Sequence, residues 1–260
     1  MIISVIVPFY NSEQWLGRCL ASLTKQFGDF EFLIVDDHST DNGREIAYDY
    51  CNQDSRFRLL TNNNGKGVSG ARNTGIDCAS GTWVTFLDAD DEMLSDAYMT
   101  FRRVIEQDDR ANMHQLNHMR YYTVIDKLAL KYANYGGVYS FGNLPDMWFG
   151  VWNTLYKADF IKDIRFDEGL QYGEDGLFNI ECLIKDNYIH HADYKVVAVK
   201  HRFDNKESLS RVKTADDIYS YIKKYEAVYE TLTDDVMRKE LAGIIGNLWS
   251  VRMVKTICNT

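Results

Sequence analysis

The chain has 260 residues, of which 38 are Asp or Glu and 29 are Lys or Arg, so its formal net charge is −9 at pH 7. This length fits one large domain with or without a small appendage, and a content of 45% hydrophobic and 26% charged residues excludes a largely disordered chain. The acid excess argues against a broad phosphate-binding surface, because such surfaces are basic, but it leaves room for a local anion site or for a metal ion held by acids.

The first half of the sequence alternates between short apolar runs and amphipathic stretches. The apolar runs predict strands at residues 2–7, 30–35, 57–60 and 83–87. The stretches that follow predict helices beginning at Asn11 or Ser12, at residue 40, at residue 68 and at Ser95, the last ending near residue 107. Four such alternations predict a Rossmann-like α/β fold with a mostly parallel central sheet.

The second half of the sequence is less regular. Residues 112–131 predict strands that extend the sheet or cover the site, and further strands are expected at 152–156 and 196–199. Residues 157–161 predict a helical turn and residues 175–185 an amphipathic helix. From residue 214 the pattern is helical to the end, with a break near residue 233, so we expect a C-terminal helical segment.

The cysteines and the lengths of the apolar runs bear on location. None of the five cysteines forms a CxxC pair, which favours reduced thiols used as small apolar side chains. No apolar run approaches the roughly 20 residues of a membrane-spanning helix, and residues 1–7 lack the basic start of a signal peptide. We therefore expect a cytoplasmic protein, with peripheral attachment to the inner membrane surface as an alternative.

Polar clusters follow the ends of all four predicted strands of the first half. They lie at residues 9–11, 36–37, 62–67 and 88–91. Parallel α/β sheets bind ligands beyond the carboxyl ends of their strands. We therefore expect these clusters to meet at one edge of the sheet and to form the functional site.

The cluster at residues 88–91 suits a divalent cation. Asp88 and Asp90 stand two residues apart at a strand end, and carboxylates this close repel one another unless a cation or a proton compensates. Mg²⁺ and Mn²⁺ prefer oxygen ligands and offset the charge of a diphosphate. The alternative is a solvated Asp-rich turn that caps the next helix.

Two further clusters suit a nucleotide. Asp36 or Asp37 could accept a hydrogen bond from a ribose hydroxyl or a base, although one of the two could instead only stabilise a turn. Residues 64–67 and 70–73 supply glycines and two cations near a helix start, where anions are favoured. Neither a Walker A loop nor a GxGxxG fingerprint is present.

Four segments in this order resemble family 2 of the inverting glycosyltransferases, which have the GT-A fold. They are residues 4–11 (SVIVPFYN), 34–41 (IVDDHSTD), 70–76 (GARNTGI) and 86–91 (FLDADD), and they cover about the first 100 residues. The resemblance implies transfer of a sugar from a nucleotide-diphosphate donor. It divides the chain into a GT-A domain at 1–212, with a donor half at 1–110 and an acceptor half at 111–212, and a helical extension at 213–260.

The resemblance also implies roles for individual residues. The nucleotide is expected to contact Pro8, Phe9, Tyr10, Asp36, Asp37, Lys66, Arg72 and Asp88. Mn²⁺ or Mg²⁺ is expected to bind Asp90, Asp88 and His201.

On the acceptor side, residues 166–168 and 172–175 resemble the family's Glu-Asp motif at the start of a helix. The implied general base is Asp175, with Glu174 as its partner or substitute. An inverting transfer needs such a carboxylate within reach of the acceptor hydroxyl. The alternative for Asp175 is an acid that only stabilises the helix N-terminus.

Later segments suggest a lid and an acceptor surface. His201, Arg202, Ser208 and Ser210 match the part of the family that closes over the diphosphate, and residues 195–213 hold six basic and two acidic side chains, a local charge of +4. Trp148 and Trp152 are candidates for stacking on an acceptor sugar. The apolar stripe of residues 236–257 suits packing on the domain, with a homo-oligomer or a membrane contact as alternatives.

Together these features predict a metal-dependent inverting glycosyltransferase that uses a UDP-sugar, with a cell-surface saccharide or a lipid-linked precursor as acceptor. A hydroxylated base of phage DNA is the alternative acceptor, supported only by the basic segment. A nucleotidyltransferase and a non-catalytic nucleotide-sugar binder are the competing classes. The former is disfavoured because residues 8–11 stand where it would carry a Gly-rich basic loop.

Overall fold

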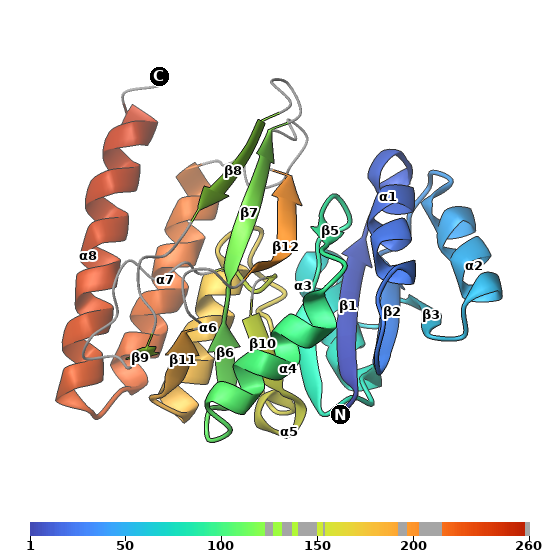
Figure 1. Ribbon diagram of the computed structural model, residues 1–260. Coiled ribbons are helices and arrows are strands. Elements are labelled where there is room, and N and C mark those ends of the chain that lie inside the picture. Colours follow the sequence, from blue (N-terminus) through green and yellow to red (C-terminus); the bar gives the residue numbers. More distant parts are fainter. Residues whose placement is uncertain are drawn as a thin grey trace.

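A computed structural model describes residues 1–122, 127–131, 137–139, 150–152, 154–191, 197–202 and 215–257. Its central sheet has eight strands in the order β3-β2-β1-β4-β10-β6-β11-β9 (Figure 1). The strands are β1 (Ile3–Phe9), β2 (Phe30–Asp36), β3 (Phe57–Thr61), β4 (Trp83–Phe86), β6 (Met113–Gln115), β9 (Gly137–Tyr139), β10 (Thr154–Lys157) and β11 (Ile189–His191). The first four are mutually parallel, β10 runs antiparallel to both its neighbours, and β11 returns to the parallel direction against β6. The predicted mostly parallel α/β sheet is confirmed.

A second sheet of four strands lies beside the first, in the order β5-β12-β7-β8. Its members are β5 (Glu92–Met93), β7 (Asn117–Tyr122), β8 (Lys127–Lys131) and β12 (Val197–Arg202). Because β5 directly follows the acidic cluster at residues 88–91, this sheet begins at the functional edge of the central one. Strands β7 and β8 confirm the strands expected within residues 112–131, and β12 confirms the strand expected at 196–199.

The helices also follow the predicted pattern. They are α1 (Glu13–Thr24), α2 (Gly43–Gln53), α3 (Val68–Cys78), α4 (Ala97–Gln107), α5 (Ala158–Ile161), α6 (Glu174–Lys185), α7 (Ala215–Thr231) and α8 (Asp235–Ile257). Ser95 as a helix cap is wrong, because Asp96 holds the N-cap position of α4 and makes no side-chain cap bond. The helix expected from residue 40 begins at Gly43, whose N–H donates to the Asp41 carboxylate at 2.9 Å.

The sheet separates two hydrophobic cores, because neighbouring side chains of a strand point to opposite faces. Val5 and Val7 of β1 lie in the core beneath α1 and α4, whereas Ile6 between them lies in the other core with α3 and α6. Both faces of β1 and β2 are fully covered, which is why these strands are apolar along almost their whole length.

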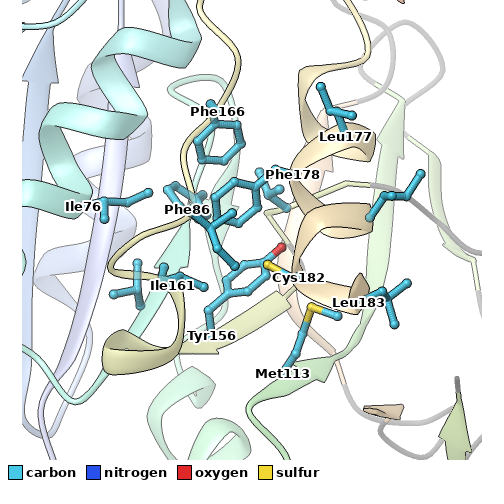
Figure 2. Close-up of a cluster of buried hydrophobic side chains, with 14 of the residues drawn as sticks. Ile76, Phe86, Met113, Tyr156, Ile161, Phe166, Leu177, Phe178, Cys182 and Leu183 are labelled. Carbon is cyan, nitrogen blue, oxygen red and sulfur yellow. The ribbon is translucent and has the colours of Figure 1, made fainter. Parts of the chain in front are cut away.

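Aromatic rings fix α6 against the sheet (Figure 2). Phe178 of α6 stacks on Phe166 with ring centroids 4.1 Å apart, and Phe86 of β4 meets Phe166 edge-on at 5.2 Å. The same core takes in Tyr225 of α7 and Leu241 of α8, both fully buried. In Figure 1, α7 and α8 lie beside α6, at the end of the sheet away from α2.

The C-terminal helices thus pack on the same core as the rest of the chain, as the apolar stripe suggested. The domain boundaries at residues 110 and 212 stay predictions. No helix in the described part of the chain is long and apolar enough to cross a membrane. The cysteines within that part, Cys19, Cys51, Cys78 and Cys182, are free thiols.

Candidate functional site

The polar clusters do meet at one edge of the central sheet, joined by hydrogen bonds between the loops that follow the strands. After β1, the Asn11 side chain accepts from the Thr40 N–H at 2.8 Å, and the Phe9 carbonyl accepts from the Asp37 N–H at 2.9 Å. The Tyr10 side chain is 46% exposed, and its ring centroid lies 5.3 Å from the Lys66 ammonium. Tyr10 and Lys66 therefore form an open cation–π pair on which a planar base could stack.

Asp36 and Asp37 are adjacent at the end of β2, but their carboxylates bind different partners. The Asp36 carboxylate accepts from the Ser39 N–H and from Arg44, each at 2.8 Å, so it stabilises its own turn and is charge-compensated. The Asp37 carboxylate instead reaches across to the next loop, accepting from the Asn62 side chain at 2.6 Å and from the Gly67 N–H at 2.9 Å. The turn-stabilising alternative therefore fits Asp36.

The loop at residues 62–67 is held from the second half of the chain by Glu168. One carboxylate oxygen accepts from the Gly65 N–H and the other from the Asn73 side chain, both at 2.9 Å. Gly70 of α3 faces the same loop, because a Cβ there would overlap the Gly65 carbonyl. Glu168 is not among the predicted site residues, and the one sequence feature that pointed to it is its place in the segment at residues 166–168.

The acidic turn after β4 gathers three carboxylates. Asp88, Asp90 and Asp91 each place one carboxylate oxygen within 4.8 Å of the others. Asp91, which was not among the predicted ligands, is fully buried. Three hard oxygen donors this close match the ligand preference of Mg²⁺ and Mn²⁺, so the chemistry of the cluster fits the expected metal ion.

Arg72 joins this turn to the start of α6. Its Nη2 donates to Asp88 at 3.1 Å, while Nη1 donates to Asp175 at 2.6 Å and to Glu174 at 3.1 Å. Gly173 makes this placement of the acids possible: its φ of 82° suits glycine, and a Cβ would overlap the Tyr221 ring of α7. The predicted contact of Arg72 with the nucleotide stays a prediction.

The environment of Asp175 suits a base. Burial raises the pKa of its carboxyl well above the ordinary value, Arg72 acts in the opposite direction, and Glu174 and Asp88 raise the pKa further. For Arg72, burial lowers the pKa, but the three carboxylates more than offset this and raise it. The Asp175 side chain keeps 21% of its surface exposed, enough for an acceptor hydroxyl to approach it.

The remaining predicted residues are placed only in part. His201 and Arg202 lie on β12, in which the neighbouring residue Lys200 pairs with Glu92, the residue that follows the acidic turn. Trp152 is buried, in contact with Gly150. Trp148, Ser208 and Ser210 lie outside the described residues.

Residues 4–143, more than half of the chain, match the sequence profile of the family described as glycosyl transferase family 2. The chain belongs to glycosyltransferase family 2. Among its relatives is glycosyltransferase GlyA of Streptococcus pneumoniae, 32% identical over 246 residues, or 89% of this chain. The chain spans only about a third (34%) of the length of GlyA.

Two further proteins extend this comparison. The UDP-Glc:α-D-GlcNAc-diphosphoundecaprenol β-1,3-glucosyltransferase WfgD of Escherichia coli is 43% identical over 91 residues, 35% of either chain. The crystal structure of Staphylococcus aureus TarS with UDP-GlcNAc superposes with a TM-score of 0.79 at 22% identity, over 96% of this chain and 72% of that one. The fold of this family 2 member is GT-A, as the resemblance implied.

Proposed function

We propose that this family 2 chain is a metal-dependent inverting glycosyltransferase that uses a UDP-sugar. One observation carries the proposal: Asp88 of the acidic turn and Asp175 at the start of α6 bind the two terminal nitrogens of a single buried guanidinium, that of Arg72. A cation-binding group for the leaving diphosphate and a base for the acceptor thus stand at one site. The TarS complex with UDP-GlcNAc supports UDP as the nucleotide.

In the proposed reaction, the donor lies along the loops after β1, β2 and β3. The nucleoside would contact Pro8, Phe9, Tyr10, Asp37 and Lys66, with Asp36 supporting the turn beside it. Asp88 and Asp90, with Asp91 added to the predicted set and His201 as a further candidate, would hold Mg²⁺ or Mn²⁺. When bound, this ion supplies positive charge to the departing diphosphate.

Asp175 would take the proton of the acceptor hydroxyl while that oxygen attacks the anomeric carbon, and the bond to the nucleoside diphosphate breaks on the opposite face. The configuration of the sugar is thereby inverted. A raised pKa makes Asp175 a stronger base than an ordinary carboxylate, which is the adjustment general-base catalysis requires. Glu174 would keep Asp175 in place.

The acceptor is proposed to be a saccharide, either at the cell surface or on a lipid-linked precursor, and the GlcNAc-diphosphoundecaprenol acceptor of the relative WfgD supports the latter. Arg202, Ser208 and Ser210 stay predicted lid residues, and Trp148 and Trp152 predicted acceptor residues. The basic segment behind the DNA alternative lies mostly outside the described residues. Transfer that is insensitive to salt would argue against DNA, whose binding weakens steeply with ionic strength.

The test separates donor binding from chemistry. We expect Asp175→Asn to abolish transfer while calorimetry finds the UDP affinity near that of the wild type. Asp90→Asn should instead weaken binding of UDP in the presence of Mn²⁺. Glu106→Gln is the matched control, since its exposed ion pair with Arg102 on α4 contributes little. If Asp175→Asn reduces binding and transfer equally, the base assignment is wrong, and if Asp90→Asn binds UDP and Mn²⁺ normally, its role as a ligand is wrong.

A further inference from the structure

Arg72 is a buried cation whose hydrogen bonds in the described structure all go to carboxylates. Its side chain is 4% exposed, and it bonds to Asp88, Glu174 and Asp175 at 3.1, 3.1 and 2.6 Å. Two of these partners are more than 100 residues away in sequence. Both terminal nitrogens of its guanidinium are therefore engaged by acids of this chain.

The aromatic core fixes the position of this guanidinium. Its central carbon lies 5.2 Å from the centroid of the Phe166 ring, which in turn stacks on Phe178 of α6. Phe178 sits on the helix that begins with Glu174 and Asp175. The same contacts therefore place both the cation and its acidic partners.

The shape and charge of an arginine suit three acids. A planar guanidinium donates along several directions at once, while a Lys ammonium is a compact point charge. Without this cation, Asp88, Glu174 and Asp175 would repel one another in a partly buried space, and such groups separate or take up protons. Either response would move the base away from its working position or remove its ability to accept a proton.

We propose that Arg72 is a positioning residue for catalysis, which holds Glu174 and Asp175 at a fixed place relative to Asp88, and that it is not a ligand of the nucleotide. This role rests on the proposed function, because it gives Asp175 the task of the base. It differs from the role implied by the family resemblance, in which Arg72 lies near the base or the diphosphate.

The experiment measures UDP affinity by calorimetry and steady-state transfer on the full chain for Arg72→Gln and Arg72→Lys. Arg165→Gln, which removes an arginine from an exposed ion pair, is the matched control. For Arg72→Gln, we expect a UDP Kd within about threefold of the wild type and a kcat lower by about 100-fold or more, since general-base catalysis contributes on that order. Added guanidinium ion should restore kcat at least about tenfold by occupying the vacated place between the acids.

Arg72→Lys separates charge from geometry, and it carries the same test should Arg72→Gln not fold. We expect its UDP affinity to be unchanged and its kcat to fall about tenfold or more, because one ammonium cannot reach three carboxylates. Unfolded protein would lower the binding stoichiometry, whereas a misplaced base lowers kcat at full stoichiometry.

Two results would overturn the proposal. One is a weaker UDP affinity with kcat unchanged at saturating donor, which is the behaviour of a nucleotide ligand. The other is a wild-type kcat in both variants. Asp175→Asn is measured alongside: if it transfers sugar normally, the proposed function fails, whereas an inactive Asp175→Asn with active Arg72 variants refutes only the role of Arg72.

Discussion

The buried histidine pair at the far side of the sheet predicts how stability depends on pH. His114 of β6 is fully buried, its Nδ1 lies 2.9 Å from Nδ1 of His190 on β11, and its ring is 5.1 Å from that of Trp83. Burial, together with the neighbouring His190, lowers the pKa of His114 from 6.5 to about 3, against a small opposing effect of Asp108. Burial also lowers the pKa of His190.

Whether stability rises or falls with pH depends on which state, folded or unfolded, binds the proton more tightly. Because the pKa is lower in the folded state, the unfolded chain protonates first as the pH falls. The contribution of His114 is therefore fully present above about pH 6.5 and is lost progressively below it, down to the folded pKa. Between pH 7 and pH 5 the loss is about 1.9 kcal/mol.

The assay compares urea unfolding at pH 7 and pH 5 in the wild type and in His114→Asn. Asn places an amide atom near the site of Nδ1, so it keeps a hydrogen-bonding group for His190 but does not titrate. We expect the wild type to lose about 2 kcal/mol more than the variant over this interval. His38→Asn is the control, since this side chain is exposed and its φ of 62° suits Asn. Equal losses in the wild type and in His114→Asn would refute the reasoning.

Two further predictions concern the loop that supports the donor site. Gly70→Ala should destabilise the chain by about 3 kcal/mol and weaken UDP binding, because its Cβ overlaps the Gly65 carbonyl; thermal unfolding measures the first effect and calorimetry the second. Gly243→Ala is its control, with open space around the Cβ in α8, and should stabilise by about 1 kcal/mol. Glu168→Gln replaces one accepting oxygen by an NH₂ donor, which would face the Gly65 N–H or the Asn73 side-chain amide, both of them donors. This change should lower the free energy of unfolding by about 1–3 kcal/mol. An unchanged urea midpoint would contradict this prediction.

Local pattern was enough for the first half of the fold. In β1 and β2 every residue is buried, so a run that is apolar except at Ser4 and Glu31 predicts the strand and the parallel sheet together. The helix ends were harder, because Ser95 and Asp96 both suit a cap and only the packed structure selects between them. The strands β6 and β11 have three residues each, and their pairing joins segments about 75 residues apart. The local hydrophobic pattern of either segment gives no information about such a long-range pairing.

In the candidate site, too, some features can be predicted from the local sequence and others depend on long-range packing. The acidic turn is contiguous in the sequence and the Glu-Asp pair is implied by the family resemblance, but their connection through Arg72 arises only when α3 and α6 pack on the same face of the sheet. The sequence alone does not distinguish Asp91 from a residue of the solvated Asp-rich turn that is the alternative for residues 88–91. Its burial is what brings it into the cluster.

The clustering of acids at the site also changes what the net charge implies about phosphate binding. A value of −9 argues against a phosphate-binding surface if the acids are spread evenly. Here Asp88, Glu174 and Asp175 bind one arginine, and Asp90 and Asp91 lie within 4.8 Å of Asp88, so the acids of this cluster outnumber the cation that they contact. A nucleotide diphosphate would add more negative charge, so donor and divalent cation should bind together and each should strengthen the other. UDP affinity should therefore fall sharply when Mn²⁺ and Mg²⁺ are removed by a chelator, and equal affinity with and without metal would show that the cluster does not recruit a cation.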